Sequence, residues 1–195
     1  MKLATALFLS FLISWAAVAN ASEPWKSGSF DPPRLAPDFV LDGSNGSPIK
    51  MSQFRGKVVA LAFGFTYCPR ICPVTLANLT KVAAQLDPTA AANFQVVFVS
   101  VDPERDSPTR MREFLDFFNP KFLGATGNSE QLEAVRQSYG IMAKRALSED
   151  KKLGYEVHHS SFIYLIDKEG QLRLLVPFGK PPEDVAHDIK LLIKK

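Results

Sequence analysis

Two cysteines and a pair of adjacent histidines are the side chains whose types and spacing could do chemistry. Cys68 and Cys72 are the only cysteines, and they follow an apolar run at 57–66 that predicts a strand buried on both faces. The residues from 73 to 86 have apolar positions at helical spacing, so both thiols lie where a strand passes into a helix. The carboxyl ends of such strands carry the sites of α/β sheets, and a helix N-terminus there lowers the pKa of a thiol.

Two sulfurs at this spacing can bind one metal ion. Cysteines at i and i+4 share one side of a helical turn, so their sulfurs can converge. Two soft thiolates suit Cu(I), zinc or an iron–sulfur centre, and a third ligand decides among them.

The three histidines are the candidates for that third ligand. His187 lies in a charged C-terminal segment, where we expect a surface residue. His158 and His159 come just before an apolar run at 162–166, which predicts another buried strand that begins near the cysteines. Neighbouring residues of a strand point to opposite faces, so only one of the two can reach the sulfurs.

The elements that must position these residues follow from apolar periodicity and turn chemistry. Strand–helix–strand units predict parallel pairing with helices on both faces, and a late hairpin adds antiparallel strands. We therefore predict an α/β, thioredoxin-like fold with a central mixed sheet and an N-terminal β-hairpin extension. The predicted order is a hairpin over 37–49, strand 57–66, helix 73–86, strand 95–101, a helix capped by Ser107, a helix over 129–139 capped by Ser129, a strand hairpin over 161–178 and a helix over 181–192.

The first residues predict an export signal. Lys2 precedes an uncharged apolar run, and Ala19-Asn20-Ala21 has the small-x-small pattern of a cleavage site. We divide the chain into a signal peptide (1–21), a flexible lead-in rich in Ser, Gly and Pro (22–36), and one domain (37–195). The alternative for the first segment is an uncleaved membrane anchor. Export places the domain in the periplasm, an oxidising compartment in which Cys68 and Cys72 can form a redox disulfide.

The composition excludes several classes of function. Hydrophobic residues make up 46% and charged residues 22%, which is typical of a globular protein. The formal net charge is +3, and no block of like charge indicates binding to nucleic acid. We expect an association with the membrane that is peripheral at most.

An acidic loop follows the second buried strand. Asp102 and Asp106 flank Glu104 and Arg105 and should lie on the same rim as the cysteines. We expect either a solvated turn in which Asp106 or Ser107 caps the next helix, or a loop that docks a partner or supports the metal ligands.

The chain resembles the Sco/SenC family of copper proteins, which serve cytochrome c oxidase assembly. The resemblance implies copper ligands at Cys68, Cys72 and His159, with Cu(I), Cu(II) or both as the bound ion. It implies a copper chaperone rather than an enzyme, whose partners are the copper-bearing subunit of cytochrome c oxidase and other periplasmic copper or thiol proteins. His158 departs from the family, which often has an acid there. The matching stretches are Pro37-Asp38-Phe39, Phe54-Arg55-Gly56-Lys57, residues 63–73, residues 100–106 and His159-Ser160 through Tyr164-Leu165-Ile166-Asp167.

Other functions remain open from the sequence. A thiol–disulfide oxidoreductase, including one that reduces the cysteines of the oxidase copper site, is permitted by the fold and compartment. Two features count against a general oxidoreductase. The cysteines are separated by three residues rather than two, and the 158–161 stretch opposite them lacks the cis-proline that thioredoxins have there. A peroxiredoxin needs a Thr-x-x-Cys arrangement, and Thr66 lies one residue too close to Cys68. An inert disulfide on a binding scaffold leaves the distant histidine unexplained.

Overall fold

The computed structural model describes residues 24–148 and 154–195. The expected signal peptide at 1–21 lies outside these residues. The described chain forms an eight-stranded mixed sheet and a separate two-stranded sheet. The strands are β1 (Gly28–Leu35), β2 (Val40–Gly43), β3 (Pro48–Lys50), β4 (Val58–Gly64), β5 (Phe94–Ser100), β6 (Leu123–Thr126), β7 (Ala143–Leu147), β8 (Tyr155–His159), β9 (Ile163–Ile166) and β10 (Gln171–Val176).

The centre of the large sheet confirms the predicted buried strands. β4 pairs in parallel with β5, β5 pairs in parallel with β6, and β9 runs antiparallel on the other side of β4. Every residue of β4 is buried, as a continuous apolar run requires when both faces of a strand are covered. This is the predicted thioredoxin-like arrangement, in the strand order β1-β10-β9-β4-β5-β6-β2-β3.

The two edges of the sheet are formed by N-terminal residues. β2 and β3 form the predicted hairpin, which joins the sheet through β2 against β6. At the opposite edge, β1 pairs antiparallel with β10. The expectation of a flexible lead-in over 22–36 is therefore wrong for residues 28–35. The Pro-rich composition misled it, because prolines are tolerated on an edge strand where one row of N–H groups needs no partner.

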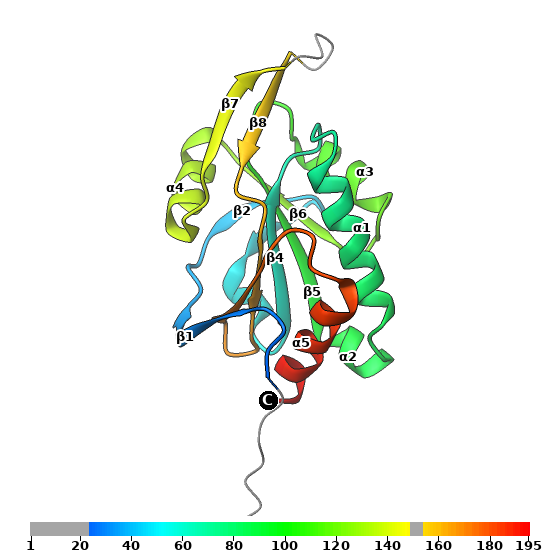
Figure 1. Ribbon diagram of the computed structural model, residues 1–195. Helices are drawn as coiled ribbons and strands as arrows, with labels where there is room; N and C mark the ends of the chain where they lie inside the picture. The colour runs from blue at the N-terminus through cyan, green and yellow to red at the C-terminus, as the bar shows by residue number, and fades with distance from the viewer. Residues whose placement is uncertain (1–23, 149–153) are drawn as a thin grey trace, which may run out of the picture.

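The helices cover both faces of the sheet. They are α1 (Ile71–Ala84), α2 (Pro88–Ala92), α3 (Pro108–Asp116), α4 (Ser129–Tyr139) and α5 (Pro182–Lys194), with a short 3₁₀ helix at Met51–Phe54. α1, α3 and α5 lie on one side of the sheet and α4 on the other (Figure 1). Ring contacts mark the two layers: Phe98 packs against Phe114 of α3, and Phe63 packs against Tyr139 of α4.

The helix caps agree with the sequence in one case and differ in another. Ser107 caps α3 as predicted, because its side chain accepts the N–H of Arg110. Asn128, rather than the expected Ser129, caps α4. Its side chain accepts the N–H of Gln131, whose own side chain accepts the Asn128 N–H, so the two residues form a capping box.

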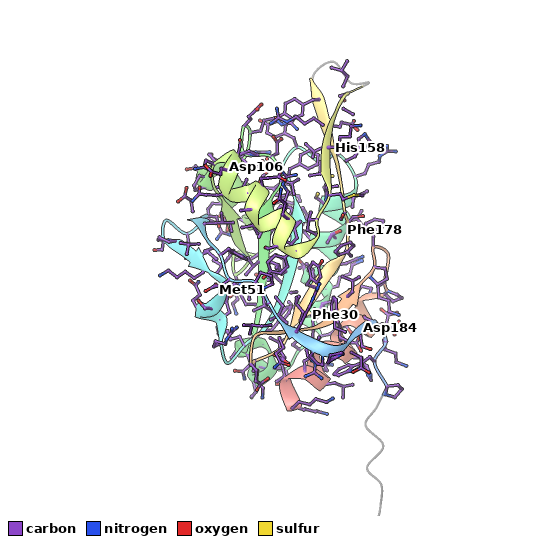
Figure 2. All side chains as sticks on the ribbon, turned by 90° about the vertical axis from the view of Figure 1, so that its left-hand side faces the viewer. Phe30, Met51, Asp106, His158, Phe178 and Asp184 are labelled. Atoms are coloured by element: carbon purple, nitrogen blue, oxygen red, sulfur yellow. The ribbon has the colours of Figure 1, made fainter. Side chains whose placement is uncertain are left out.

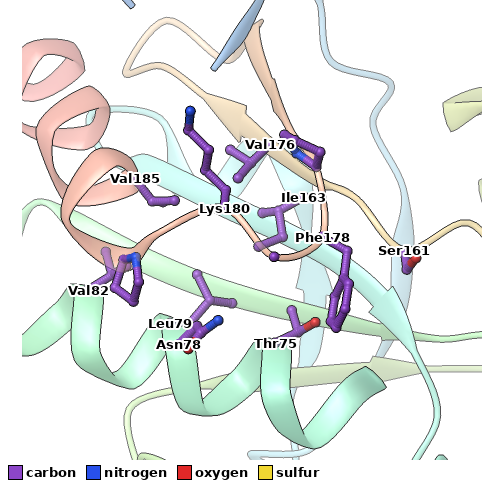
Figure 3. Close-up of a pocket in the computed structure, with 13 residues that line it drawn as sticks. Thr75, Asn78, Leu79, Val82, Ser161, Ile163, Val176, Phe178, Lys180 and Val185 are labelled. Atoms are coloured by element: carbon purple, nitrogen blue, oxygen red, sulfur yellow. The ribbon is translucent and has the colours of Figure 1, made fainter. Parts of the chain in front are cut away.

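α1 and α5 pack closely over the end of the sheet. Leu79 and Val82 of α1 face Ile163, Val176 and Val185 there, and Figure 3 shows these side chains gathered around a narrow gap. The gap encloses about 20 Å³, which is room for a single water molecule at most. This region therefore belongs to the packing of the fold rather than to a ligand site.

A hairpin of β7 and β8 extends beyond the large sheet, at the top of Figure 1. The sequence pattern does not predict this hairpin. It pairs Ala143 with His159 and Leu147 with Tyr155. Because β8 ends at His159, this hairpin carries both candidate histidines to the carboxyl end of β4.

Candidate metal centre

The turn between β4 and α1 carries both cysteines. α1 begins at Ile71, two residues earlier than the predicted helix, so Cys72 lies in its first turn and Cys68 lies in the turn before it. The expectation that both cysteines lie on one turn of a helix is therefore wrong for Cys68, which lies before the start of α1. The backbone N–H of Cys72 donates to Cys68 Sγ at 3.4 Å, which brings the first sulfur back over the helix start. Both cysteines are free thiols.

A buried carboxylate anchors this turn to the neighbouring strand. Asp106, only 1% exposed, accepts the hydroxyl of Thr66 at 2.7 Å and the Thr66 backbone N–H at 3.2 Å. It also accepts the hydroxyl of Ser100 at the end of β5, at 2.6 Å. Asp106 therefore supports the start of the cysteine turn, which is one of the roles expected for it, and the solvated and docking alternatives are wrong because it is fully buried.

A glycine leaves room for the second sulfur. A Cβ atom at Gly64 would lie 2.7 Å from Cys72 Sγ and 2.5 Å from Cζ of Phe98. Both distances are shorter than any ordinary contact, so the close approach of α1 to β4 depends on the missing side chain. Cys72 is 2% exposed as a result, whereas Cys68 is half-buried.

His159 supplies a nitrogen beside the two sulfurs. Its Nε2 lies 3.7 Å from Cys72 Sγ, and its ring packs edge-on against Phe65. Nδ1 lies 2.8 Å from the carbonyl oxygen of Ser160, which can only accept, so Nδ1 carries the proton. Nε2 then has a free lone pair directed at the thiols, which is the tautomer that a metal ligand needs.

The three predicted ligand residues therefore come together. Among the described residues, one group of His, Cys, Asp and Glu side chains could hold a metal ion, and it consists of Cys68, Cys72 and His159. Their ligand atoms all lie within 4.8 Å of one another. A cavity of about 210 Å³ opens onto Cys68 and His159 and connects them to solvent.

The two thiols differ strongly in acidity. The hydrogen bond that the Cys72 thiol donates to Cys68, with a smaller contribution from His159, lowers the pKa of Cys68 to about 4, although partial burial opposes this. The same hydrogen bond, burial and the nearby Cys68 charge raise the pKa of Cys72 well above its usual range. At neutral pH the site thus holds one accessible thiolate and one buried thiol.

The other two histidines lie elsewhere. His158 is exposed on β8, where strand alternation turns it away from the sulfurs as predicted; Figure 2 shows it on the hairpin, with Asp106 in the body of the molecule. His187 is half-buried on α5, with Nε2 3.4 Å from the carbonyl oxygen of Pro24. It therefore lies at the surface as expected, although it is not fully exposed.

Arg105 links the cysteine turn to the hairpin, a contact that the sequence pattern does not predict. Its guanidinium lies 3.7 Å from the ring centroid of Tyr155 on β8 and 4.9 Å from that of Tyr67 in the cysteine turn. Nη1 donates to the carbonyl oxygen of Tyr155 at 3.1 Å. Contacts of this geometry are cation–π interactions, which join the two halves of the site.

Asp102 completes this link from inside the protein. It is fully buried, forms an ion pair with Arg105 and accepts the hydroxyl of Tyr155 at 2.7 Å. The expectation of a solvated or docking acidic loop is therefore wrong for Asp102 as well. No local pattern could have revealed the contact, because Tyr155 lies 53 residues away from Asp102 in the chain.

Comparisons with known proteins agree with this geometry. The model of the SCO1/SenC family matches residues 28–194. A SCO2-like protein of Rickettsia felis is 32% identical over 157 residues, which cover 80% of this chain and 76% of the relative. The structure of Bradyrhizobium japonicum ScoI with copper bound is 31% identical, with a TM-score of 0.73 over 81% of this chain and 99% of the other.

A structure solved without metal matches equally well. The apo Sco1 protein of Thermus thermophilus is 36% identical, with a TM-score of 0.75 over 88% of this chain and 97% of the other. In residues 24–148 and 154–195, no helix is long and apolar enough to cross a membrane. Because the family model spans most of the sequence and the relatives match over most of their own length, the chain belongs to the SCO1/SenC family.

Proposed function

We propose that Cys68, Cys72 and His159 bind copper and that the protein delivers it to the copper site of cytochrome c oxidase. The observation that carries the proposal is the convergence of two sulfurs and one imidazole nitrogen within 4.8 Å, beside an open cavity. The family membership and the copper in a related structure support the same choice of ion.

The donor set fits copper in both common oxidation states. Thiolates are soft ligands that favour Cu(I), and an imidazole nitrogen suits Cu(II). Metal binding requires both thiols to be deprotonated, so Cys72 must release its proton when the ion binds. Cys68 already carries a thiolate at neutral pH, and it therefore offers the first bond to an incoming ion.

The surroundings of the site support delivery rather than permanent storage. Cys68 and His159 border a cavity that is open to solvent, so a ligand from a partner can reach the ion. Three protein ligands leave a coordination position free for that partner. The exposed apolar side chains of Tyr67, Ile71 and Val74 surround the cysteine turn and offer a surface on which a protein partner can dock.

A second function, reduction of the disulfide in the oxidase copper site, is favoured by the acidity of the thiols. The accessible Cys68 thiolate would attack one sulfur of the substrate disulfide and release the other as a thiol. Cys72, after losing its proton, would then attack Cys68, close the Cys68–Cys72 disulfide and release the second substrate thiol. A low pKa at the accessible cysteine and a buried, protonated partner are what this sequence of steps requires.

Copper titration of the reduced and the disulfide forms tests the first function. We expect one tightly bound copper per chain in the reduced protein and none retained by the disulfide form after desalting, because a cysteine binds the ion only as a thiolate. Equal loading of both forms would refute the cysteine assignment.

His159→Ala should lose Cu(II) more completely than Cu(I), with His158→Ala as the matched control that keeps both ions. Reduction of a disulfide peptide from the oxidase subunit by copper-free protein would establish the second function instead.

We also propose that residues 1–21 direct export to the periplasm. The pattern at Ala19-Asn20-Ala21 supports cleavage before Ser22. The intact mass of protein from a periplasmic extract tests this, and a full-length species found only in the membrane fraction would contradict it.

A further inference from the structure

A second cavity lies next to the metal centre, on the other side of His158. It encloses about 720 Å³ and is lined by Met142, Lys144 and His158 of the hairpin and by Glu133 and Arg136 of α4. His158 also lines the smaller cavity that opens onto Cys68. His159 lines both cavities as well, so the two imidazoles of the hairpin lie between the larger opening and the cysteine site.

Met142 shares a strand face with His158. The backbone N–H of Ser160 donates to the carbonyl oxygen of Met142, and the next pairs along the hairpin are Ala143 with His159 and Lys144 with His158. Met142 and His158 are thus diagonal neighbours on one face, about 7 Å apart at Cβ and within reach of long side chains. His159 lies on the opposite face, toward the sulfurs.

The exposure of Met142 has no explanation in packing. Its side chain is 78% exposed, whereas Met51 and Met111 are completely buried in the core. Within the described residues, the imidazole of His158 makes no hydrogen bond or ion pair. A thioether and a neutral imidazole, both free to turn toward one point, are ligands that suit Cu(I).

We propose that Met142 Sδ and His158 form an outer Cu(I) site, from which the ion passes to the cysteine site. The proposal rests on the proposed copper function and adds a route of entry to it. In the transfer, the bonds from Cu(I) to Met142 and His158 break, and bonds to Cys68, Cys72 and His159 replace them. The Cys72 thiol releases its proton to water, and copper stays Cu(I) throughout.

The charges around the cavity suit a site of passage. Glu133 and Arg136 neutralise each other in an ion pair, so neither attracts nor repels the ion strongly. Lys144 lies directly across the hairpin from His158 and adds a positive charge near the site. Two neutral ligands beside one cation give weak binding, whereas the two thiolates inside bind more tightly, and the ion therefore moves inward.

Removing the thiols isolates the outer site for measurement. The Cys68→Ser/Cys72→Ser double variant would be titrated anaerobically with Cu(I) while the methionine methyl and histidine ring signals are followed by NMR. We expect the signals of Met142 and His158 to shift together and to saturate at one equivalent, while those of Met51, Met111 and His187 stay unchanged. Absence of any shift, or a shift of His158 and His159 without Met142, would overturn the proposal.

The full chain tests the transfer separately. Met142→Leu keeps the volume of the side chain and removes the sulfur. With the thiols intact and reduced, we expect this variant to load Cu(I) several-fold more slowly, as followed by thiolate–copper absorbance, and to reach the same final stoichiometry. An unchanged loading rate would overturn the transfer. If the chain without substitutions fails to bind one Cu(I), this would instead refute the proposed function of the cysteine site.

Discussion

The two sides of the candidate copper centre are built in different ways. The cysteine side belongs to the body of the protein, where every residue of β4 is buried and Cys72 is 2% exposed. The histidine side belongs to the β7–β8 hairpin, in which Val157 is the one buried residue and Leu147 is 93% exposed. The sulfurs are therefore held by the core, and the nitrogen is held by an element with little core of its own.

This difference has a consequence for ligand exchange. Segments that bury few apolar groups open at a lower free energy than the core strands do. The hairpin contacts the body through Tyr155, which meets Arg105 and Asp102, through His159, which meets Phe65, and through ion pairs of Arg145 with the 102–106 loop. A small movement of the hairpin can thus withdraw the nitrogen while both sulfurs keep their geometry, which suits a protein that accepts and releases an ion.

The largest expected effect is on the pH dependence of the reactivity of Cys68, on the sulfur side of the centre. With the pKa of Cys68 lowered to about 4, its thiolate persists as the pH falls and is lost only near pH 4. We expect the rate of alkylation of Cys68 to stay nearly constant between pH 8 and pH 5.5. An ordinary thiol, with a pKa of about 8.5, is only about one part in a thousand thiolate at pH 5.5. Peptide mapping after brief iodoacetamide treatment measures this, and Cys72 should stay unmodified.

Two variants show whether this acidity depends on the body or on the hairpin. Cys72→Ala removes the largest cause of the lowered pKa, so the reactivity of Cys68 should fall at low pH as an ordinary thiol's does. His159→Ala removes a smaller cause and should shift the profile less. A larger shift in His159→Ala than in Cys72→Ala would show that the hairpin controls the sulfurs after all.

A mutation at Gly64 tests how tightly the body holds the second sulfur. In Gly64→Ala the added methyl group collides with Phe98 and with Cys72 Sγ. We expect a loss of about 1–3 kcal/mol in the free energy of unfolding, as for other overpacked cores, together with weaker copper binding. Gly28→Ala is the matched control on edge strand β1, where the new methyl group has ordinary contacts. Urea unfolding with both variants measures the difference, and equal stabilities would contradict a rigid sulfur side.

The same contrast explains what could be predicted from the sequence. β4 and β5 were predicted correctly because a continuous apolar run marks a strand that is buried on both faces. The predicted fold also brought one of the two adjacent histidines to the cysteine turn, whereas the choice of His159 came from the family resemblance. Features of the body therefore left clear local signals.

The hairpin left no such signal. Its strands, 143–147 and 155–159, are short and have one buried residue between them, so they lack the apolar alternation by which strands are recognised. The contact of Arg105 with Tyr155 joins residues 50 positions apart and depends on the tertiary structure alone. The burial of Asp102 could not be predicted for the same reason, since the Tyr155 hydroxyl that it accepts lies on another element.

The smallest expected effect comes from one hydroxyl group on the hairpin. Tyr155→Phe keeps the ring beneath Arg105 and removes the hydrogen bond to Asp102, which also contributes, after burial, to the raised Tyr155 pKa of about 12. We expect a loss of about 0.5–1.5 kcal/mol, confined to the opening of the hairpin. Amide hydrogen exchange should therefore speed up in β7 and β8 by up to about tenfold and stay unchanged in β4.

Tyr67→Phe is the control for this variant. Tyr67 stacks on the same guanidinium from the cysteine turn, but within the described residues its hydroxyl donates to no protein group. The Tyr67→Phe variant should leave amide hydrogen exchange in β7 and β8 unchanged. Copper binding supplies the second readout: Tyr155→Phe should weaken Cu(II), which needs the nitrogen of His159, more than Cu(I), which the sulfurs retain. Equal weakening of both ions would mean that the hairpin and the cysteine turn move as one body, because a hairpin that opens alone affects only the nitrogen.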